Sequence, residues 1–258
     1  MNKLFNNPAI LTEDKKVKIR KVVFFFPIII FIILLTLKLF WDNVYIEITK
    51  EDSLLEDIQF ITYFSAAIIA ITVGIKKTSQ IALINSIILV FLGVSLFFIS
   101  MEEISWGQRL FNINTPELLK EHNAQKEISI HNLEIFNNKL VIIYALVGLV
   151  LSFSWIPYKY GILSKKKKGN LGRTVHLFIP KWYIMFYFLP TFLLYTYWAQ
   201  EFYLKTRFDW YKWDSTLINN FLKPYDQESV EFLLATGLFI YIIDLVYQFK
   251  YSPAKLGI

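Results

Sequence analysis

The chain has 258 residues, of which 55% are hydrophobic, 18% are aromatic and only 19% are charged. Soluble domains usually carry about a quarter charged residues, so this composition excludes a disordered chain and a water-soluble enzyme. The sequence contains no cysteine, which excludes a disulfide scaffold and a Cys-ligated zinc module. The mean hydropathy of +0.43 indicates an integral membrane protein, despite a formal net charge of +6.

Six segments are predicted to cross the membrane as helices. About 20 mostly apolar residues are needed, because each residue rises about 1.5 Å through about 30 Å of hydrocarbon. We therefore expect an all-α, polytopic bundle of six transmembrane helices. It forms one integral membrane domain over residues 1–258, with spans at 22–41, 54–75, 81–101, 140–158, 182–200 and 230–249.

Lysine and arginine are distributed unevenly between the two faces that these spans define. One face holds both termini and has 17 basic and two acidic residues, whereas the other has 10 basic residues, including Lys38, and 18 acidic ones. The positive-inside rule then predicts that both termini are cytoplasmic. The four-lysine run at 165–168 lies beside a helix end, where it meets anionic lipid headgroups. The expected partner is therefore the lipid bilayer and not nucleic acid.

Acidic residues gather at the predicted outer ends of four helices. They are Glu51, Asp52, Glu56, Asp57, Glu102, Glu103, Glu201, Glu228 and Glu231. Bundling of the helices would bring these ends towards one region lined by carboxylates. Ser53 and Glu56 have a local explanation, because their spacing is that of a capping box at a helix start. Glu102, Glu103 and Glu201 lie at helix C-termini, where the helix dipole disfavours anions by about 0.3–1 kcal/mol, so another interaction must compensate them.

The densest polar stretch covers residues 101–111, at the start of an outer polar loop at 102–139. If the helix continues past the apolar run, then Glu102, Ser105 and Arg109 lie on one helical face. One interpretation is an interfacial turn, with Trp106 at headgroup level. The other is a catalytic site, in which Glu102 or Glu103 acts as a base or metal ligand and Arg109 holds an anion.

A second polar stretch in the same loop contains Glu127 and His131. Their i, i+4 spacing would let them bind one metal ion together with Glu103, or share one proton. The chain has only three histidines, so a divalent cation here would be Mg²⁺, Mn²⁺ or Ca²⁺ and not a zinc ion bound by several histidines. The alternative is a local hydrogen bond between Glu127 and His131 ahead of the fourth span.

These two stretches carry a resemblance. The string Glu-Glu-Ile-Ser-Trp-Gly-Gln-Arg at 102–109, followed by Asn-x-Gln-x-Glu-x-x-x-His-Asn at 123–132, resembles a group of uncharacterised bacterial multi-pass membrane proteins. The resemblance covers the second to fourth spans. It implies a bacterial plasma membrane as the location, and it transfers no activity.

Three functions fit these observations. The first is an enzyme acting on a lipid or lipid-linked substrate at the outer leaflet, with Glu102, Glu103, Arg109 and His131 as catalytic residues. The second is an ion-coupled transporter, for which Asp244 inside the sixth span is either a proton relay or the partner of a nearby basic group. The third is a non-catalytic subunit whose outer loops dock a partner. We favour the enzyme, because the polar groups converge at one depth and form no path across the bilayer.

Overall fold

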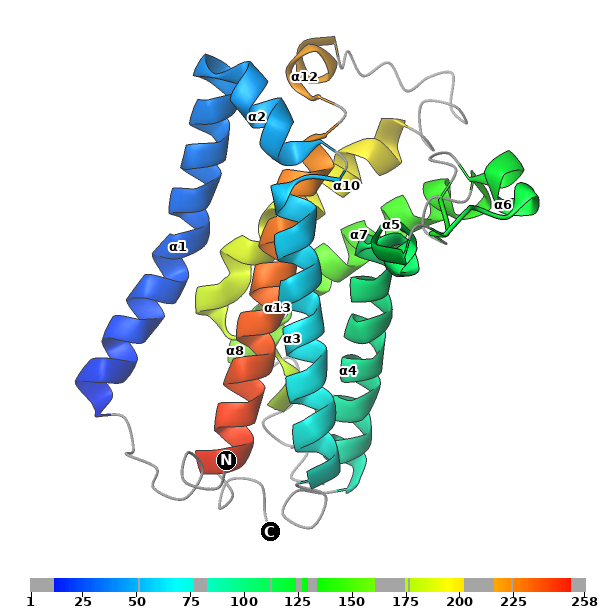
Figure 1. Cartoon of the computed structure of the whole chain (residues 1–258). Coiled ribbons are helices and arrows are strands. Elements are labelled where there is room, and N and C mark those ends of the chain that lie inside the picture. Colours follow the sequence, from blue (N-terminus) through cyan, green and yellow to red (C-terminus); the bar gives the residue numbers. More distant parts are fainter. Residues whose placement is uncertain are drawn as a thin grey trace.

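The computed structural model describes residues 12–50, 52–76, 83–111, 113–123, 127–129, 134–160, 175, 177–201, 216–223 and 225–251. Every regular element in these ranges is a helix (Figure 1), so the all-α prediction is confirmed for the described chain. The elements are α1 (Glu13–Phe40), α2 (Asp42–Thr49), α3 (Leu54–Lys76), α4 (Leu83–Glu103), η1 (Ser105–Gly107), α5 (Gln108–Phe111), α6 (Glu117–His122), α7 (Glu134–Phe153), α8 (Trp155–Lys159), η2 (Trp182–Ile184), α10 (Met185–Ala199), α12 (Thr216–Phe221) and α13 (Asp226–Tyr251).

Five stretches of the described chain are long and apolar enough to cross a membrane. They contain α1, α2 with α3, α4, α7 with α8, and α13. The sixth predicted span, 182–200, is divided between the single turn η2 and α10, which has 15 residues and therefore rises only about 22 Å. The described chain thus has five candidate spans by length and composition, and the sixth span stays a prediction.

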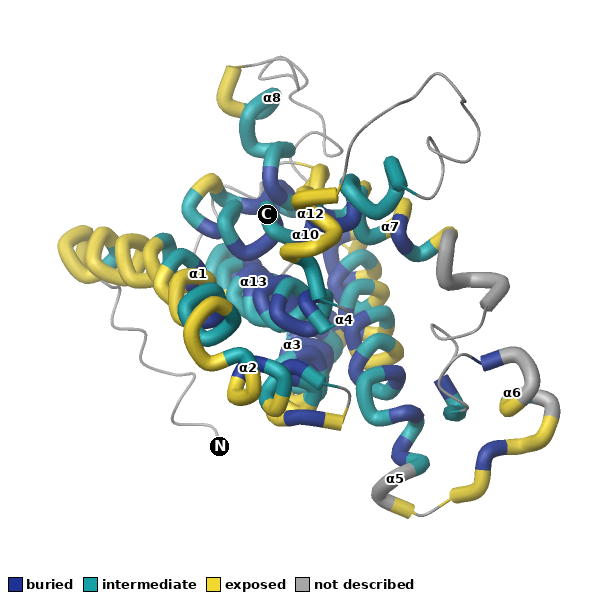
Figure 2. Tube along the Cα trace, turned by 90° about the horizontal axis from the view of Figure 1, so that it is seen from above, coloured by how far each residue is buried: buried dark blue, intermediate teal, exposed yellow. Residues whose placement is uncertain are grey.

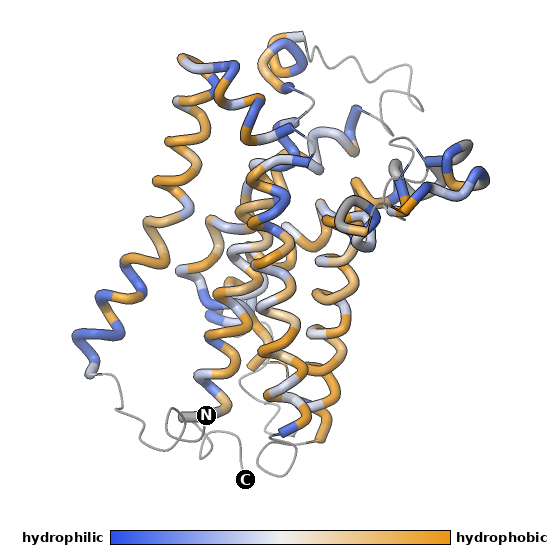
Figure 3. Tube along the Cα trace, in the orientation of Figure 1, coloured by the Kyte–Doolittle hydropathy of each residue, from blue (hydrophilic) through white to orange (hydrophobic). Residues whose placement is uncertain are grey.

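The long helices run up and down in turn. In Figure 1, α1, α4 and α10 end at the upper end of the bundle, where α3, α7 and α13 begin. The described chain therefore begins and ends at the lower end, as expected for termini on one side of a membrane. Figure 3 shows hydrophobic residues along the lengths of α1, α3 and α4, with hydrophilic residues gathered near the helix ends.

Close helix packing depends on small residues in the core. Ala66, Ala67 and Ala70 of α3 are fully buried, where α3 packs on α4 and α13. At Gly148 of α7, an added Cβ would lie 2.5 Å from the backbone nitrogen of Phe192 in α10. Small residues of this kind let helix backbones approach each other where hydrocarbon supplies no hydrophobic drive.

Helix α1 stands at the edge of this bundle. Only 11% of its most apolar stretch is buried, against 39% in α13. Figure 2 shows α1 at the periphery with long exposed segments. Its exposed residues include Phe25, Ile29 and Ile33, and such an apolar outer face is suited to lipid.

We predict that Gly148→Val lowers the free energy of unfolding by about 1–3 kcal/mol, because the added methyl groups would meet the backbone of α10. Thermal unfolding of the detergent-solubilised protein measures the change. The control is Leu149→Val at a 39% exposed position, which is expected to change stability by less than about 0.5 kcal/mol. Equal effects of the two substitutions would contradict the close packing of α7 on α10.

Candidate functional site

Four glutamates meet at the upper end of the bundle. Glu103 from the end of α4 interacts electrostatically with Glu56 of α3 and with Glu228 and Glu231 of α13. Glu231 in turn interacts with Glu228 and Glu56. The structure therefore brings three helix ends together in one carboxylate-lined region, which we name the glutamate cluster (Glu56, Glu103, Glu228 and Glu231).

Neutral side chains bind and surround this cluster. The fully buried Gln59 amide donates to both the backbone oxygen and Oε2 of Glu228, at 3.2 and 3.1 Å. The Tyr195 hydroxyl of α10 donates to Oε1 of Glu231. The ring of Tyr144 from α7 stacks on Tyr195 with centroids 4.6 Å apart. Five helices thus contribute to the site.

The electrostatics of the cluster are unusual for the end of a helix bundle. The charged groups that act most strongly on Glu103 are all carboxylates, with Glu102 joining the three other members of the cluster. Carboxylates crowded in this way repel one another, and a proton or a cation relieves the repulsion. Ionisable groups at the depth of spanning helices are costly, and they are usually kept for function.

The chain turns sharply where α4 ends. Ser105, Trp106 and Gly107 have φ values of 46°, 57° and 78°, so three consecutive residues are left-handed. The expectation that Glu102, Ser105 and Arg109 share one helical face is therefore wrong, because the helix ends at Glu103. Left-handed backbone is unfavourable for residues other than glycine and must be held by surrounding contacts.

Side chains hold this turn in place. The Trp106 indole N–H donates to Oε1 of Glu102, and the Ser105 hydroxyl donates to Oε2 of Glu127. The Trp106 ring also packs edge-on against Phe98, with centroids 5.2 Å apart. These contacts support the interpretation of this stretch as a structured turn, and they direct Glu102 and Glu103 to different partners.

The rest of the polar loop is joined by hydrogen bonds. Gln108 is central, because its amide donates to the Thr115 hydroxyl at 2.6 Å and accepts from the Ile128 N–H at 2.7 Å. The Asn123 amide donates to the Ser129 carbonyl at 2.7 Å. Residues 108, 115, 123 and 127–129 therefore form one hydrogen-bonded unit beside the end of α4.

The described residues do not test the predicted metal site. His131 lies outside the described residues, and so does the side chain of Arg109. Within the described residues, no group of three or more Asp, Glu and His side chains is arranged to hold a metal ion. The set of Glu103, Glu127 and His131 therefore stays a prediction.

The capping box at the start of α3 is formed only in part. Glu56 does reach back over the helix start, but its Oε2 accepts from the Asp52 N–H at 2.6 Å, one residue before the expected donor. The Ser53 hydroxyl donates to the Ile48 carbonyl at 2.8 Å. Its bond joins α2 to α3, so Ser53 fixes the corner between these helices.

A second polar group lies on the other side of α13. Lys38 near the end of α1 forms an ion pair with Asp226, and their side chains are only 7% and 8% exposed. The Tyr45 hydroxyl donates to Oδ1 of Asp226 at 2.6 Å and lies 3.0 Å from Oγ of Ser229. The Lys223 backbone N–H donates to Oδ2 of Asp226 at 2.9 Å. We name Lys38, Tyr45, Asp226 and Ser229 the Lys38 cluster.

Asp244 lies near the lower end of α13 and is bound by its neighbours. The Tyr183 hydroxyl donates to its Oδ1 at 3.0 Å and the Gln248 amide to its Oδ2 at 2.8 Å. Lys181 and Arg20 also act on it electrostatically. This arrangement supports the interpretation of Asp244 as the partner of nearby basic groups.

Sequence reasoning missed Gln59, Tyr144 and Tyr195, because each lies inside an otherwise apolar stretch. The sequence signal that could have identified these residues was the position of a polar side chain inside a predicted span. A side chain with an amide or hydroxyl placed about one turn inside a predicted span needs a hydrogen-bond partner there. For Gln59 and Tyr195 that partner is a glutamate of α13, whereas Tyr144 stacks on Tyr195.

We predict that breaking the buried pair of Lys38 and Asp226 is costly. Lys38→Met alone and Asp226→Asn alone should each lower the free energy of unfolding by about 3–5 kcal/mol, because each leaves a buried charged or polar group without its partner. The double variant should recover part of this loss. Thermal unfolding of all three variants gives the coupling energy.

The control for this cycle is the pair of Lys223 and Asp42. Its side chains are 34% and 45% exposed, so breaking it should change stability by only about 0–1 kcal/mol. Equal losses at the two pairs would show that burial does not set the strength of the Lys38 pair.

Comparison with known proteins gives no indication of the function. No family model, no curated protein and no solved structure matches the chain. The resemblance to bacterial multi-pass membrane proteins therefore stays a prediction, and function has to be argued from the side chains that meet at the upper end.

Proposed function

We propose that the protein is a membrane-embedded enzyme that acts on a lipid or lipid-linked substrate, with the glutamate cluster as its acid–base machinery. One observation carries the proposal: glutamates from three helices, with tyrosine and glutamine partners, converge at one end of an otherwise apolar bundle. Carboxyl groups whose neighbours differ are suited to opposite proton-transfer roles in one reaction. The reaction class is hydrolysis or headgroup transfer.

The surroundings of three of the four carboxyl groups suggest a role for each of these three. Glu103 is only partly buried and is the candidate base that takes a proton from water or a substrate hydroxyl. Glu231 with Tyr195 is the candidate acid that returns a proton to the leaving group. Glu228 is held at two atoms by Gln59, so it is a positioning residue.

The neighbouring loop would supply anion and cation binding. In the proposed enzyme, Arg109 binds a phosphate or carboxylate of the substrate, and Glu127 with His131 takes a divalent cation such as Mg²⁺, Mn²⁺ or Ca²⁺. Glu102 is bonded to Trp106 and is adjacent to the base. These roles rest on the sequence pattern and on the position of the loop beside the end of α4.

The proposed location follows from charge. By sequence, the face that holds both termini carries 17 of the 27 lysines and arginines. We therefore place that face in the cytoplasm and the glutamate cluster at the outer leaflet of a bacterial plasma membrane. In this arrangement η2 and α10 together form the sixth crossing. Residues 182–200 would rise about 28 Å, close to the thickness of the hydrocarbon core.

The transporter alternative has less support. Asp244 and the glutamate cluster are the acidic groups that such a carrier would use, but Glu231 and Asp244 lie about 20 Å apart along the axis of α13. A direct proton relay cannot cover that distance, since hydrogen bonds join atoms about 3 Å apart. A role as a non-catalytic subunit would not explain why glutamates from three helices come together with tyrosine and glutamine partners.

We predict that Glu103→Gln and Glu231→Gln each reduce lipid turnover by about 10²–10⁴-fold, the usual contribution of general acid–base catalysis. The assay follows headgroup release from a panel of phospholipids and lipid-linked sugars in proteoliposomes. The matched control is Glu47→Gln, because Glu47 is a 68% exposed surface glutamate paired with Lys50. It should keep full activity.

Three results would contradict this function. They are no turnover of any lipid by the parent protein, activity retained in both cluster variants, and equal loss in the Glu47 control. Proton-dependent uptake that depends on Glu103, with no chemical product, would favour the transporter.

The cation can be tested separately. After equilibration with Mn²⁺, the detergent-purified protein should retain about one ion. Glu127→Ala and His131→Ala should each lose this ion, because both residues are proposed ligands of the same site. Glu117→Ala is the control, since Glu117 is an exposed glutamate paired with Lys120 in the same loop. Retention of Mn²⁺ by the His131 variant would remove histidine from the site.

A further inference from the structure

Helix α1 contacts the bundle at two levels with an interval between them. At the lower level, the Tyr187 hydroxyl donates to the Val23 carbonyl at 3.0 Å, and the Phe24 ring packs on Trp182 and Phe186. At the upper level, Lys38 pairs with Asp226. The two levels are about 22 Å apart along α1.

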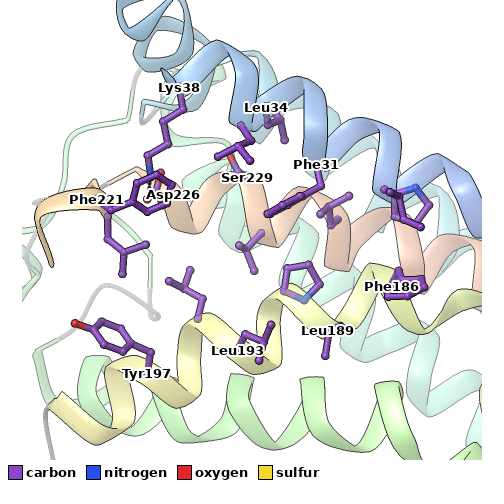
Figure 4. Close-up of a pocket in the computed structure, with 18 of the residues that line it drawn as sticks. Phe31, Leu34, Lys38, Phe186, Leu189, Leu193, Tyr197, Phe221, Asp226 and Ser229 are labelled. Atoms are coloured by element: carbon purple, nitrogen blue, oxygen red, sulfur yellow. Dashed lines mark hydrogen bonds and ion pairs between the residues drawn. The ribbon is translucent and has the colours of Figure 1, made fainter. Parts of the chain in front are cut away.

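An apolar groove of about 600 Å³ occupies the interval. It lies between α1, α10 and α13, and residues of α12 close its upper end. Figure 4 shows its lining side chains, and Phe31, Leu34, Leu189 and Leu193 are among those on α1 and α10. Phe31 and Leu193 are 48% and 58% exposed, so the groove has open apolar surface.

The polar residues of the groove are gathered towards one end. Lys38, Tyr45, Asp226 and Ser229 all line it, and Figure 4 shows Lys38, Asp226 and Phe221 close together there. The groove is therefore amphipathic along its length, with an apolar body and a polar head region at the level where α1 ends.

We propose that this groove binds a zwitterionic phospholipid, with one acyl chain along α1, the phosphate at Lys38 and a primary ammonium at Asp226. The proposal goes beyond the proposed function, because it rests on α1 and the Lys38 cluster and needs no reaction at the glutamate cluster. It assigns the class of ligand from the shape and the charge of the site.

The size of the groove suits an acyl chain. The groove runs beside α1 from Pro27 to Lys38, about 16 Å. Its volume of about 600 Å³ lies within the range of about 300–1,000 Å³ that is usual for pockets that bind small molecules.

Charge favours a zwitterion over an anionic lipid. The Lys38 ammonium has three donors, and among the described residues Asp226 is the one acceptor bonded to it, so donors remain for phosphate oxygens. Asp226 already accepts from Lys38, Tyr45 and the Lys223 N–H, and a carboxylate can accept about four bonds. A primary ammonium would be the fourth donor, whereas a net anion would meet the carboxylate unpaired.

The headgroup has to supply the selectivity. An acyl chain that enters the groove from the bilayer moves from one hydrocarbon environment to another. Burial of the chain therefore contributes little to the free energy of binding. Lys38 and Asp226 are held in the groove by Tyr45, by the Lys223 N–H and by the Phe221 ring, which lies 4.0 Å from the Lys38 ammonium. Such a preformed pair discriminates between headgroups at low cost.

The test uses phosphatidylethanolamine with a photoreactive group midway along one acyl chain, reconstituted with the full-length protein in vesicles. Cross-linked peptides should map to α1 and α10. Leu35→Trp and Leu193→Trp fill the groove and should reduce labelling by about tenfold, equivalent to one decade of affinity. The control, Ile33→Trp, is on α1 at a 48% exposed position outside the groove and should label normally.

Competition on the parent protein tests the headgroup without any substitution. Unlabelled phosphatidylethanolamine should reduce labelling more strongly than phosphatidylcholine or phosphatidylglycerol, and inorganic phosphate should not compete. Equal or better competition by phosphatidylglycerol would overturn the charge assignment. Labelling that is unchanged in both groove variants would overturn the site. Labelling of a parent protein that turns over no lipid would uphold the groove and reject only the enzyme.

Discussion

The first two turns of α13 organise the upper end of the molecule. Asp226 and Ser229 are three residues apart and so lie on one face of the helix, and the same is true of Glu228 and Glu231. The two pairs are offset by two residues, or about 200° around the axis, which places them on opposite faces. One face meets α1 and the groove, and the other meets the ends of α3, α4 and α10. The Lys38 cluster and the glutamate cluster are therefore tied to one rigid element.

Much of the fold could be predicted from composition, because backbone N–H and C=O groups in hydrocarbon must be hydrogen-bonded within the protein and helices achieve this. Lengths of apolar sequence located the helices that form α1, α3, α4, α7 and α13. Two details could not be obtained in this way. The first is the start of α10, which begins only at Met185, three residues into the predicted span. The second is the end of α4, which is followed by a left-handed turn that hydropathy does not register.

The position of the candidate site in the bundle could be predicted from the sequence, but several of its residues could not. The gathering of acids at the helix ends pointed to the upper end of the bundle, and Glu103 is indeed there. The partners Gln59, Tyr144 and Tyr195 come from helices far apart in the sequence, so no local spacing could pair them with Glu228 or Glu231. Lys38 is the reverse case. Lys38 lies on the acidic face, although most lysines and arginines are on the other face. Its buried pairing with Asp226 gives the physical reason.

The attachment of α1 also sets an order on assembly. α3 and α4 follow each other in the chain and pack along their lengths, so they can join as soon as both exist. Lys38 of α1 and Asp226 of α13 are 188 residues apart, so their contact cannot form before the start of α13 has been synthesised. The upper end of α1 is thus fixed only after α3, α4, α7 and α10 have been made. Until then its place beside α10 is open to whatever hydrocarbon the membrane supplies.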